Sequence, residues 1–273
     1  MSFSTAGERI IGTPAVSEGI VVFGSADRNI YGLNAENGQL LWKVEAQEPV
    51  IGAVTIDNGL AYVGASDHTF RAIDIHTGKV VWKYGEVKGY IETKPLITDN
   101  KVIFGAWDNT LYALDKNDGK EIWKWTGGLT RMHFSPAAVW PVAAEGKVFI
   151  ADPQRALTSI DIDNGETVWR TFESQVRETV GLSEDGKQIY SKTMNDSIVC
   201  FATQGDTPKK FLLLQYWLAY IKDPVRLLVL ILGNIFSYAS SVPTANRATF
   251  VLFSMRFSLL TSAAQRRILL KAC

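Results

Sequence analysis

The stretch AIDIHTGKVVW, residues 72–82, decides the fold because nearly the same eleven-residue motif, called the phrase here, occurs four times in the chain. The other copies are GLNAENGQLLW at 32–42, ALDKNDGKEIW at 113–123 and SIDIDNGETVW at 159–169. Their tryptophans are 40, 41 and 46 residues apart. A period of this length is typical of repeat architectures, in which each repeat is one small structural unit.

Each phrase ends a repeat that contains four predicted strands. In the second repeat, alternating apolar residues and turn residues predict strands at about 50–56, 60–65, 69–74 and 79–84. Four short antiparallel strands in about 40 residues is the period of a β-propeller blade. The sequence therefore predicts an all-β partial propeller of four complete four-stranded blades, followed by a fifth, incomplete blade at 178–206.

Three kinds of residue recur within the phrase, and each has a structural use. A short polar side chain begins the turn and can accept hydrogen bonds from its backbone, a glycine supplies the positive φ that closes it, and a tryptophan offers an apolar face to the next blade. The turn residues are Asn34, Asp74, Asp115 and Asp161, the glycines are Gly38, Gly78, Gly119 and Gly165, and the docking tryptophans are Trp42, Trp82, Trp123 and Trp169.

Charge and cysteine content exclude several classes of function. The net charge is zero overall, which argues against a nucleic-acid partner, and the two cysteines, Cys200 and Cys273, form neither a disulfide framework nor a CxxC metal site. The N-terminal residues MSFSTAGERIIGTP lack the basic start and apolar run of a secretory signal. We expect either a cytoplasmic protein or a parent chain that begins further upstream.

The recurring pattern Ala-x-Asp-x-x-x-Gly-x-x-x-Trp resembles the tryptophan-docking blade of the PQQ-like β-propellers over about residues 5–205. That family includes quinoprotein alcohol dehydrogenases, the propeller lipoprotein of the outer-membrane barrel-assembly machine, and propellers attached to metallophosphoesterase or kinase domains. The run from Arg131 to Asp161 looks most like the propellers of bacterial metallophosphoesterases. For a longer parent, the resemblance implies a periplasmic or outer-membrane-associated location.

The resemblance also implies what a catalytic member would need. Quinone enzymes of the family hold PQQ beside adjacent half-cystines, with a calcium ion bound by carboxylate and amide ligands, whereas Cys200 has no cysteine neighbour. The Asp-x-His, Gly-Asp-x-x-Asp and Gly-Asn-His motifs of metallophosphoesterases are also absent from the sequence. We therefore expect no PQQ, no metal and no catalytic residue on this chain.

The last 63 residues differ from the repeats in their charge composition. Before residue 211 there are 27 acidic and 21 basic residues, but residues 211–273 carry seven basic residues and one acid, Asp223. We therefore divide the chain into the repeats at 1–210 and an apolar, basic tail at 211–273. The leading interpretation of the tail is translation in a shifted frame after Lys209 and Lys210, in a chain truncated at both ends. A membrane-associated segment and a small folded domain are the alternatives, although no apolar run reaches the 18 or so residues of a membrane span.

Candidate binding residues gather on one predicted rim. Successive antiparallel strands send their turns to opposite ends, so the turns between second and third strands share a rim with the loops between blades. Loops on a rigid scaffold commonly carry binding sites. Aspartates that recur from blade to blade are expected to stabilise turns, and Arg131 and His133 are either solvated loop residues or contacts to an anionic or peptide ligand. The candidate ligand-binding residues are Trp107, Asp108, Arg131, His133, Arg155, Arg177 and Asn195.

The function that these observations favour is a non-enzymatic β-propeller that serves as a binding or assembly scaffold, with a protein or peptide as the expected partner. Membrane contact through 211–273 is a further expectation. The alternatives are the accessory propeller of a metallophosphoesterase and a fragment of a quinoprotein-type dehydrogenase.

Overall fold

The computed structural model describes residues 6–127, 140–152, 154–195 and 197–211. The chain divides into two compact units, Met1–Lys210 and Phe211–Cys273. Of the second unit only its first residue is described, so the expectations for the tail fall outside the described residues, as do those for Arg131 and His133.

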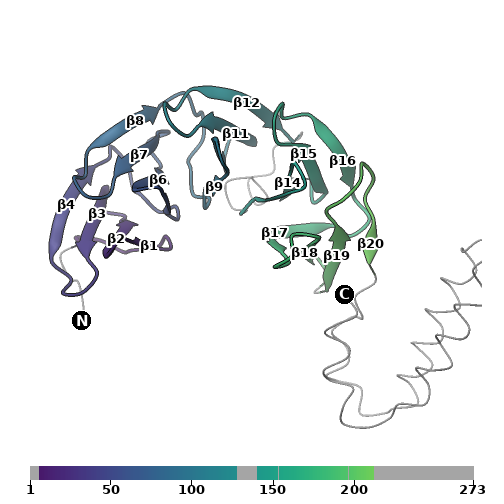
Figure 1. The fold of residues 1–273 in the computed structure, drawn as a ribbon, viewed down its shortest axis with the longest axis horizontal. Helices are drawn as coiled ribbons and strands as arrows, with labels where there is room; N and C mark the ends of the chain where they lie inside the picture. Colours follow the sequence, from purple (N-terminus) through teal and green to yellow (C-terminus); the bar gives the residue numbers. More distant parts are fainter. Residues whose placement is uncertain (1–5, 128–139, 153, 196, 212–273) are drawn as a thin grey trace, which may run out of the picture. The chain divides into compact units, whose positions relative to one another are not determined.

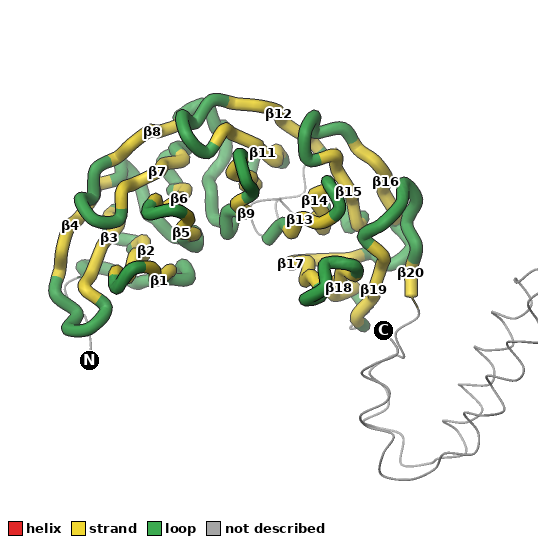
Figure 2. The backbone as a smooth tube through the Cα atoms, in the orientation of Figure 1, coloured by secondary structure: helices red, strands yellow, loops and turns green. Residues whose placement is uncertain are grey.

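The described part of the chain consists of strands and loops and contains no helix (Figure 2). Consequently, no helix in these ranges could span a membrane. The strands form five four-stranded sheets, each in simple meander order and antiparallel where its strand pairing is defined. The predicted fold class, an all-β partial propeller, is confirmed.

Each sheet is one blade, and the blades are numbered here in chain order. Blade 1 contains β1 (Ala15–Ser17), β2 (Ile20–Gly24), β3 (Asn29–Asn34) and β4 (Leu40–Glu45). Blade 2 contains β5 (Thr55–Asp57), β6 (Leu60–Gly64), β7 (Phe70–Asp74) and β8 (Val80–Tyr84). Blade 3 contains β9 (Leu96–Ile97), β10 (Lys101–Gly105), β11 (Thr110–Asp115) and β12 (Glu121–Thr126).

Blade 4 contains β13 (Val142–Ala144), β14 (Lys147–Ala151), β15 (Leu157–Asp161) and β16 (Thr167–Thr171). Blade 5 contains β17 (Val176–Leu182), β18 (Gln188–Thr193), β19 (Ile198–Ala202) and β20 (Lys210–Phe211). The fifth blade thus has the three predicted strands and two residues of a fourth. Figure 1 shows the fourth strands of blades 1–4 on the outer side of the row of sheets and the first strands on the inner side.

The first strand of the second repeat is shorter than its apolar pattern predicts. Only Thr55–Asp57 joins the blade's ladder, whereas the preceding residues bond to the blade before. Val50 N–H donates to the Ser25 carbonyl at 3.0 Å and Val54 N–H to the Thr13 carbonyl at 3.1 Å. Val50 and Val54 are buried in this loop between blades, as they would be in a strand of the blade. The apolar pattern therefore could not distinguish the strand from the loop.

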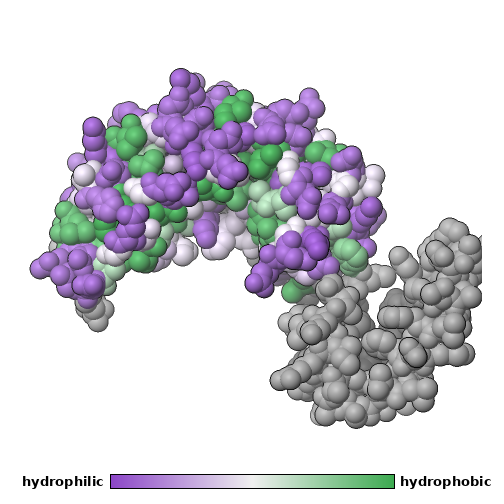
Figure 3. All heavy atoms as spheres, viewed as in Figure 1, coloured by the Kyte–Doolittle hydropathy of each residue, from purple (hydrophilic) through white to green (hydrophobic). Residues whose placement is uncertain are grey.

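The core lies between neighbouring sheets, so a central strand is buried on both of its faces. On β10, Val102 and Phe104 pack against blade 2, while Ile103 packs against blade 4. The rings of Phe70 and Phe104 stack across the junction of blades 2 and 3 with centroids 4.0 Å apart. Such strands therefore read as short continuous apolar runs. Hydrophilic residues predominate on the face of the blades seen in Figure 3.

The first three docking tryptophans each join two consecutive blades by a hydrogen bond. Trp82 Nε1 on β8 donates to the Lys116 carbonyl of blade 3 at 3.0 Å, and Trp42 and Trp123 make the equivalent bonds to Ile75 and Ile162, at 2.5 and 2.9 Å. Each indole also lies over the turn glycine of the next blade. A Cβ built on Gly119 would meet the Trp82 ring at 2.5 Å, and Gly78 and Gly165 have the same relation to Trp42 and Trp123.

A small residue faces each tryptophan within its own blade. The register pairs Gly32 with Trp42, Ala72 with Trp82, Ala113 with Trp123 and Ser159 with Trp169, and a bulge follows directly in every case. A Cβ on Gly32 would lie 2.1 Å from the indole of Trp42. The small residue that begins each phrase therefore leaves room for the ring to lie flat on its own sheet.

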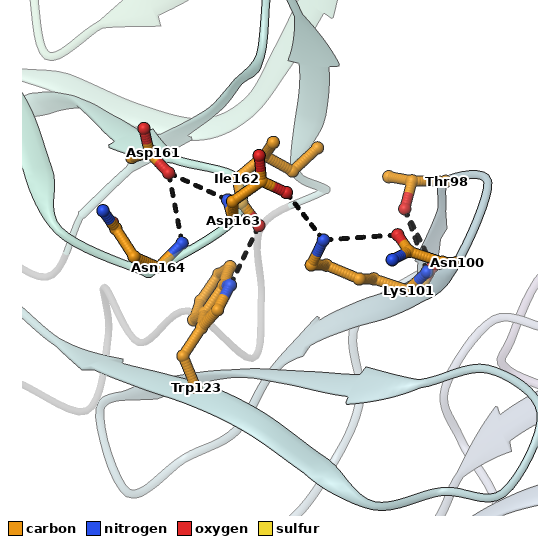
Figure 4. A network of polar contacts seen from close by, with 8 residues as sticks. All are labelled: Thr98, Asn100, Lys101, Trp123, Asp161, Ile162, Asp163 and Asn164. Carbon is orange, nitrogen blue, oxygen red and sulfur yellow. Dashed lines mark hydrogen bonds and ion pairs between the residues drawn. The ribbon is translucent and has the colours of Figure 1, made fainter.

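The junction of blades 3 and 4 shows how the phrase works as a unit (Figure 4). Asp161 Oδ1 accepts the backbone N–H groups of Asp163 and Asn164 at 2.9 and 3.1 Å, which shapes the turn and presents the Ile162 carbonyl to Trp123. The same turn places the Asp163 carboxylate 2.9 Å from Lys101 Nζ of blade 3. Glu18 with His76 and Asp57 with Lys116 make equivalent contacts at the two earlier junctions.

The junction of blades 4 and 5 departs from this pattern. Trp169 is buried, but its Nε1 atom has no hydrogen-bond partner in the described part of the chain. The atoms nearest a Cβ on Gly205 belong to Lys209 rather than to an indole. The turn of blade 5 is wider, since Ala202 N–H bonds to the Lys209 carbonyl and no acid stands at its start. The fourth tryptophan therefore packs in the core against Phe149 and Phe201 without docking through its N–H.

Candidate functional site

The strap rim is the name used here for the end of the blades formed by the turns between second and third strands together with the loops between blades. In blade 2 its centre is Asp67. One carboxylate oxygen accepts the N–H of Thr69 at 3.1 Å, and the other accepts the N–H of Gln47 at 3.1 Å, in the loop that arrives from blade 1. Ser66 N–H completes the attachment by donating to the Pro49 carbonyl at 2.9 Å.

Residues 47–49 are thus a strap, a three-residue segment pinned to the turn at both ends, and the arrangement recurs. In blade 1, Asp27 accepts the N–H of Gly7 at 2.7 Å, and Ala26 N–H donates to the Arg9 carbonyl. In blade 3, the equivalent strap is residues 88–90. Asp108 accepts the N–H of Lys88 at 3.1 Å, and Trp107 N–H donates to the Tyr90 carbonyl at 3.0 Å.

A side-chain partner adds a further contact to each of these three aspartates. The carboxylate of Asp67 forms a buried ion pair with Arg71, while those of Asp27 and Asp108 accept the hydroxyls of Tyr31 and Tyr112, at 2.7 and 2.5 Å. Burial raises the pKa of Asp67, but the bonds from Arg71 and from the backbone outweigh it and hold the pKa below its usual value. The recurring aspartates therefore have their oxygens engaged in structure.

Blades 4 and 5 shape the same turn with other residues. In blade 4, Asp152 accepts the N–H groups of Gln154 and Ala156 and is paired with Arg170, which also donates to the Gly127 carbonyl at 2.9 Å. In blade 5, Thr193 Oγ1 accepts the N–H of Ser197 at 3.2 Å. The rim is thus rigidly built in every blade, although the aspartate of blades 1–3 is absent from its position in the last two.

The structure places the described candidates on this rim but divides them between blades, whereas Arg131 and His133 lie outside the described residues. Trp107 and Asp108 share the turn of blade 3, and the Trp107 Nε1 atom is buried without a partner. Arg155 lies in the turn of blade 4, in the left-handed region at φ 67°. In blade 5, Arg177 on β17 lies opposite Lys192, and Asn195 follows β18.

The described rim has a hollow at blade 2, where no candidate had been predicted. Its volume is about 540 Å³, and it is lined by Gln47, Glu48, Pro49, Ser66, Asp67, His68 and Tyr90. Tyr90 is 51% exposed, and its ring lies 5.4 Å from that of His68. One signal in the sequence pointed here: Tyr90 is an aromatic residue at a strap position that holds Arg9 and Pro49 in the preceding repeats.

The described side chains of the rim do not form a metal-ion site. Within the described ranges, no group of three or more histidine, cysteine, aspartate or glutamate residues could hold a metal ion. Cys200 is buried on β19. The chemistry that the rim offers is therefore hydrogen bonding, aromatic contact and charge on a fixed framework.

Comparison with solved structures finds the same fold in proteins of different kinds. BamB from Moraxella catarrhalis is 23% identical over 77% of this chain and 64% of its own, with a TM-score of 0.62. The quinohemoprotein alcohol dehydrogenase from Comamonas testosteroni is 16% identical over 77% of this chain and 43% of its own, with a TM-score of 0.61. The computationally designed protein Ika8 is 19% identical over 69% of this chain and 57% of its own, with a TM-score of 0.59.

These likenesses show the fold alone, and this chain spans less than two thirds of the length of each of the three structures. A search of curated proteins found no match. The protein family described as outer membrane protein assembly factor BamB matches residues 3–207, which is three quarters of the chain and includes all four copies of the repeated phrase. The chain therefore belongs to this family of PQQ-like β-propeller repeat proteins.

Proposed function

We propose that this chain is a non-enzymatic binding or assembly scaffold that holds a protein or peptide partner on the strap rim. The observation that carries the proposal is the use of the rim carboxylates. The groups that recur from blade to blade, Asp27, Asp67 and Asp108, are committed to pinning straps. The exposed side chains around these aspartates vary between blades. Such variation on a common framework allows a propeller to bind a specific partner.

Membership of the BamB family supports this proposal, since that family is described by its part in the assembly of outer membrane proteins. By the same reasoning we propose a periplasmic or outer-membrane-associated location and a protein rather than a nucleic-acid partner. The overall charge of zero agrees with the second point, because nucleic-acid binders carry basic surfaces.

We further propose that the chain works without PQQ. The single described cysteine, Cys200, is buried, and the rim aspartates that could have been calcium ligands already accept backbone N–H groups. Reconstitution of the full chain with PQQ and calcium, followed by dye reduction in the presence of an alcohol, tests this directly. Dye reduction that depends on both additives would replace the scaffold by a dehydrogenase.

Site-specific photo-cross-linking in cells tests the scaffold itself. A photoreactive residue is placed at Arg155 or Asn195 on the strap rim. The matched controls carry it on the opposite rim, at Asn164 of blade 4 or at Glu36 of blade 1. We expect one discrete protein product from the strap rim and none from the control positions. A product of equal yield at both rims, or none at either, would contradict the proposal.

A further inference from the structure

The hollow at blade 2 is bounded by groups that attract positive charge. Glu48 is exposed and has no hydrogen bond or ion pair among the described residues. The Asp67 carboxylate is also in the wall, but it is buried with Arg71, whose guanidinium balances its charge. The uncompensated charge lining the hollow is therefore the single negative charge of Glu48.

Two cations lie on adjoining segments without lining the hollow. The Arg28 carbonyl accepts the N–H of Ala46, just before the strap of blade 2, and Lys88 begins the strap that carries Tyr90. Both side chains are exposed, so water screens them. These two cations lie outside the hollow, so neither occupies it nor pairs with the charge of Glu48 in its wall.

Tyr90 adds an aromatic face beside this carboxylate. The face of a tyrosine ring carries negative potential, and a guanidinium or ammonium group is attracted to it. A guanidinium can stack on such a ring while its N–H groups donate to a carboxylate in the same plane, which is the geometry that arginine uses in recognition sites. The His68 ring lies beside Tyr90, and its buried Nδ1 atom has no hydrogen-bond partner among the described residues.

This combination is particular to blade 2. At the turn position of His68, blades 1, 3 and 4 carry Arg28, Asn109 and Arg155, all in the same left-handed conformation. At the strap position of Tyr90, blades 1 and 2 carry Arg9 and Pro49. Among the described blades, an unpaired acid, an exposed aromatic ring and a histidine meet at this place alone.

Resting on the proposed function, we infer that the hollow receives a cationic side chain, an arginine or lysine, from an extended segment of the protein partner. Its volume of about 540 Å³ lies within the range of sites that bind one small ligand. The cation stacks on Tyr90 and pairs with Glu48, and the adjoining peptide lies over the straps.

Histidine NMR on the full chain tests this inference with an arginine probe. The protein has three histidines, and His76, which lies on the opposite rim in contact with Glu18, serves as the internal control. We expect N-acetyl-arginine amide to shift the His68 ring signals saturably and to leave those of His76 in place. The neutral isostere N-acetyl-citrulline amide is expected to produce no saturable shift.

Two variants test the named contacts. Glu48→Gln removes the charge and is expected to weaken the arginine probe about tenfold, the order of one charge-assisted hydrogen bond. Tyr90→Leu removes the ring face and is expected to weaken it several-fold. Glu36→Gln, at an exposed acid on the opposite rim, is the matched control and should leave the affinity unchanged.

The outcomes separate this inference from the scaffold proposal. An equal response to the citrulline probe, or no response of His68 to arginine in folded protein, would overturn the cation site. If the strap rim still cross-links to a partner in that case, the scaffold stands and only the chemistry of the hollow is wrong. If arginine binds but nothing cross-links, the hollow stands and the scaffold proposal fails.

Discussion

Trp82 and Lys116 belong to different blades, and the indole N–H of the first donates to the backbone carbonyl of the second at 3.0 Å. The Tyr62 hydroxyl of blade 2 reaches the same carbonyl at 3.2 Å. Because the acceptor is a main-chain group, its position depends on the shape of the turn and not on the side chain of Lys116. The recurring acid and glycine of the phrase fix that shape, which explains why they accompany the tryptophan.

Replacing the docking tryptophans should therefore have unequal effects. Trp82→Phe removes a hydrogen bond as well as ring area, whereas Trp169→Phe removes ring area alone, because the Trp169 Nε1 atom has no partner. We expect Trp82→Phe to lower the free energy of unfolding by about 1 kcal/mol more than Trp169→Phe, the net worth of one hydrogen bond. Urea unfolding followed by circular dichroism measures the difference, and equal losses would show that the bond to Lys116 contributes nothing.

A pair of glycines separates backbone strain from blade contact. Gly119 and Gly59 both have φ 73°, but a Cβ on Gly119 would lie 2.5 Å from the Trp82 ring, whereas a Cβ on Gly59 would meet nothing within 4 Å. Gly59→Ala should cost about 1 kcal/mol of conformational strain. Gly119→Ala should cost about 1–3 kcal/mol more, because the indole must move. Thermal unfolding of both variants checks this, and comparable stabilities would mean that the indole relocates freely.

The buried ion pair of Asp67 and Arg71 predicts sensitivity to acid. The pKa of Asp67 is lowered in the folded protein, so its stabilising contribution is complete above the ordinary value of 3.8 and is lost as the pH falls below it, through the folded-state pKa. Asp67→Ala leaves Arg71 buried and unpaired and should cost about 3–5 kcal/mol. The double variant Asp67→Ala/Arg71→Met should recover part of this loss. Urea midpoints of the three proteins at neutral pH measure it, and no recovery would show that the straps, not the charge, dominate.

Alkaline pH should lower the free energy of unfolding through Tyr62, whose hydroxyl joins blades 2 and 3. Burial, with nearby aspartate charges, raises the pKa of Tyr62 to about 12 from an ordinary value of 10.0. A raised pKa means that this stabilising contribution is complete below pH 10 and is lost as the pH rises toward 12. The pKa values of Tyr31, Tyr84 and Tyr112 are raised as well. We therefore expect tyrosinate absorbance to show a late-titrating set that loses one group in Tyr62→Phe. Ionisation of all tyrosines near their ordinary pKa in folded protein would contradict this.

The sequence could predict the blades because their determinants are local. Asp74, Gly78 and Trp82 lie within one phrase, and each acts through a turn or a ring that the phrase itself builds. Trp169 packs between blades 4 and 5 as predicted, and its missing hydrogen bond arises from the turn of the next blade. Its own phrase is complete, but the next blade has Ala202 at the start of the turn, so the carbonyl is not presented. Docking is a property of two repeats, and the pattern of one repeat cannot reveal it.

The strap rim was harder to predict for a different reason. The oxygen of Asp67 that holds the strap bonds to the backbone N–H of Gln47, and a backbone group leaves no signature in side-chain identity. The hollow depends on which side chains the straps of two blades bring together, Glu48 from one and Tyr90 from the next. Neither residue belongs to the recurring phrase, so the repetition of the phrase gives no indication of either one.

Every junction from blade 1 to blade 4 has a forward half, the tryptophan of an outer strand, and a backward half, the glycine turn of the following blade. Because the indole N–H bonds to a main-chain carbonyl and the ring lies over a glycine, this part of the junction does not depend on the side chains of the turn it contacts. Blades of this kind all join through the same tryptophan and glycine contacts. Duplication or loss of one repeat of about 40 residues would therefore leave the new neighbours able to make these contacts. Lineages using them can lengthen or shorten a propeller by whole blades while rim side chains diverge independently.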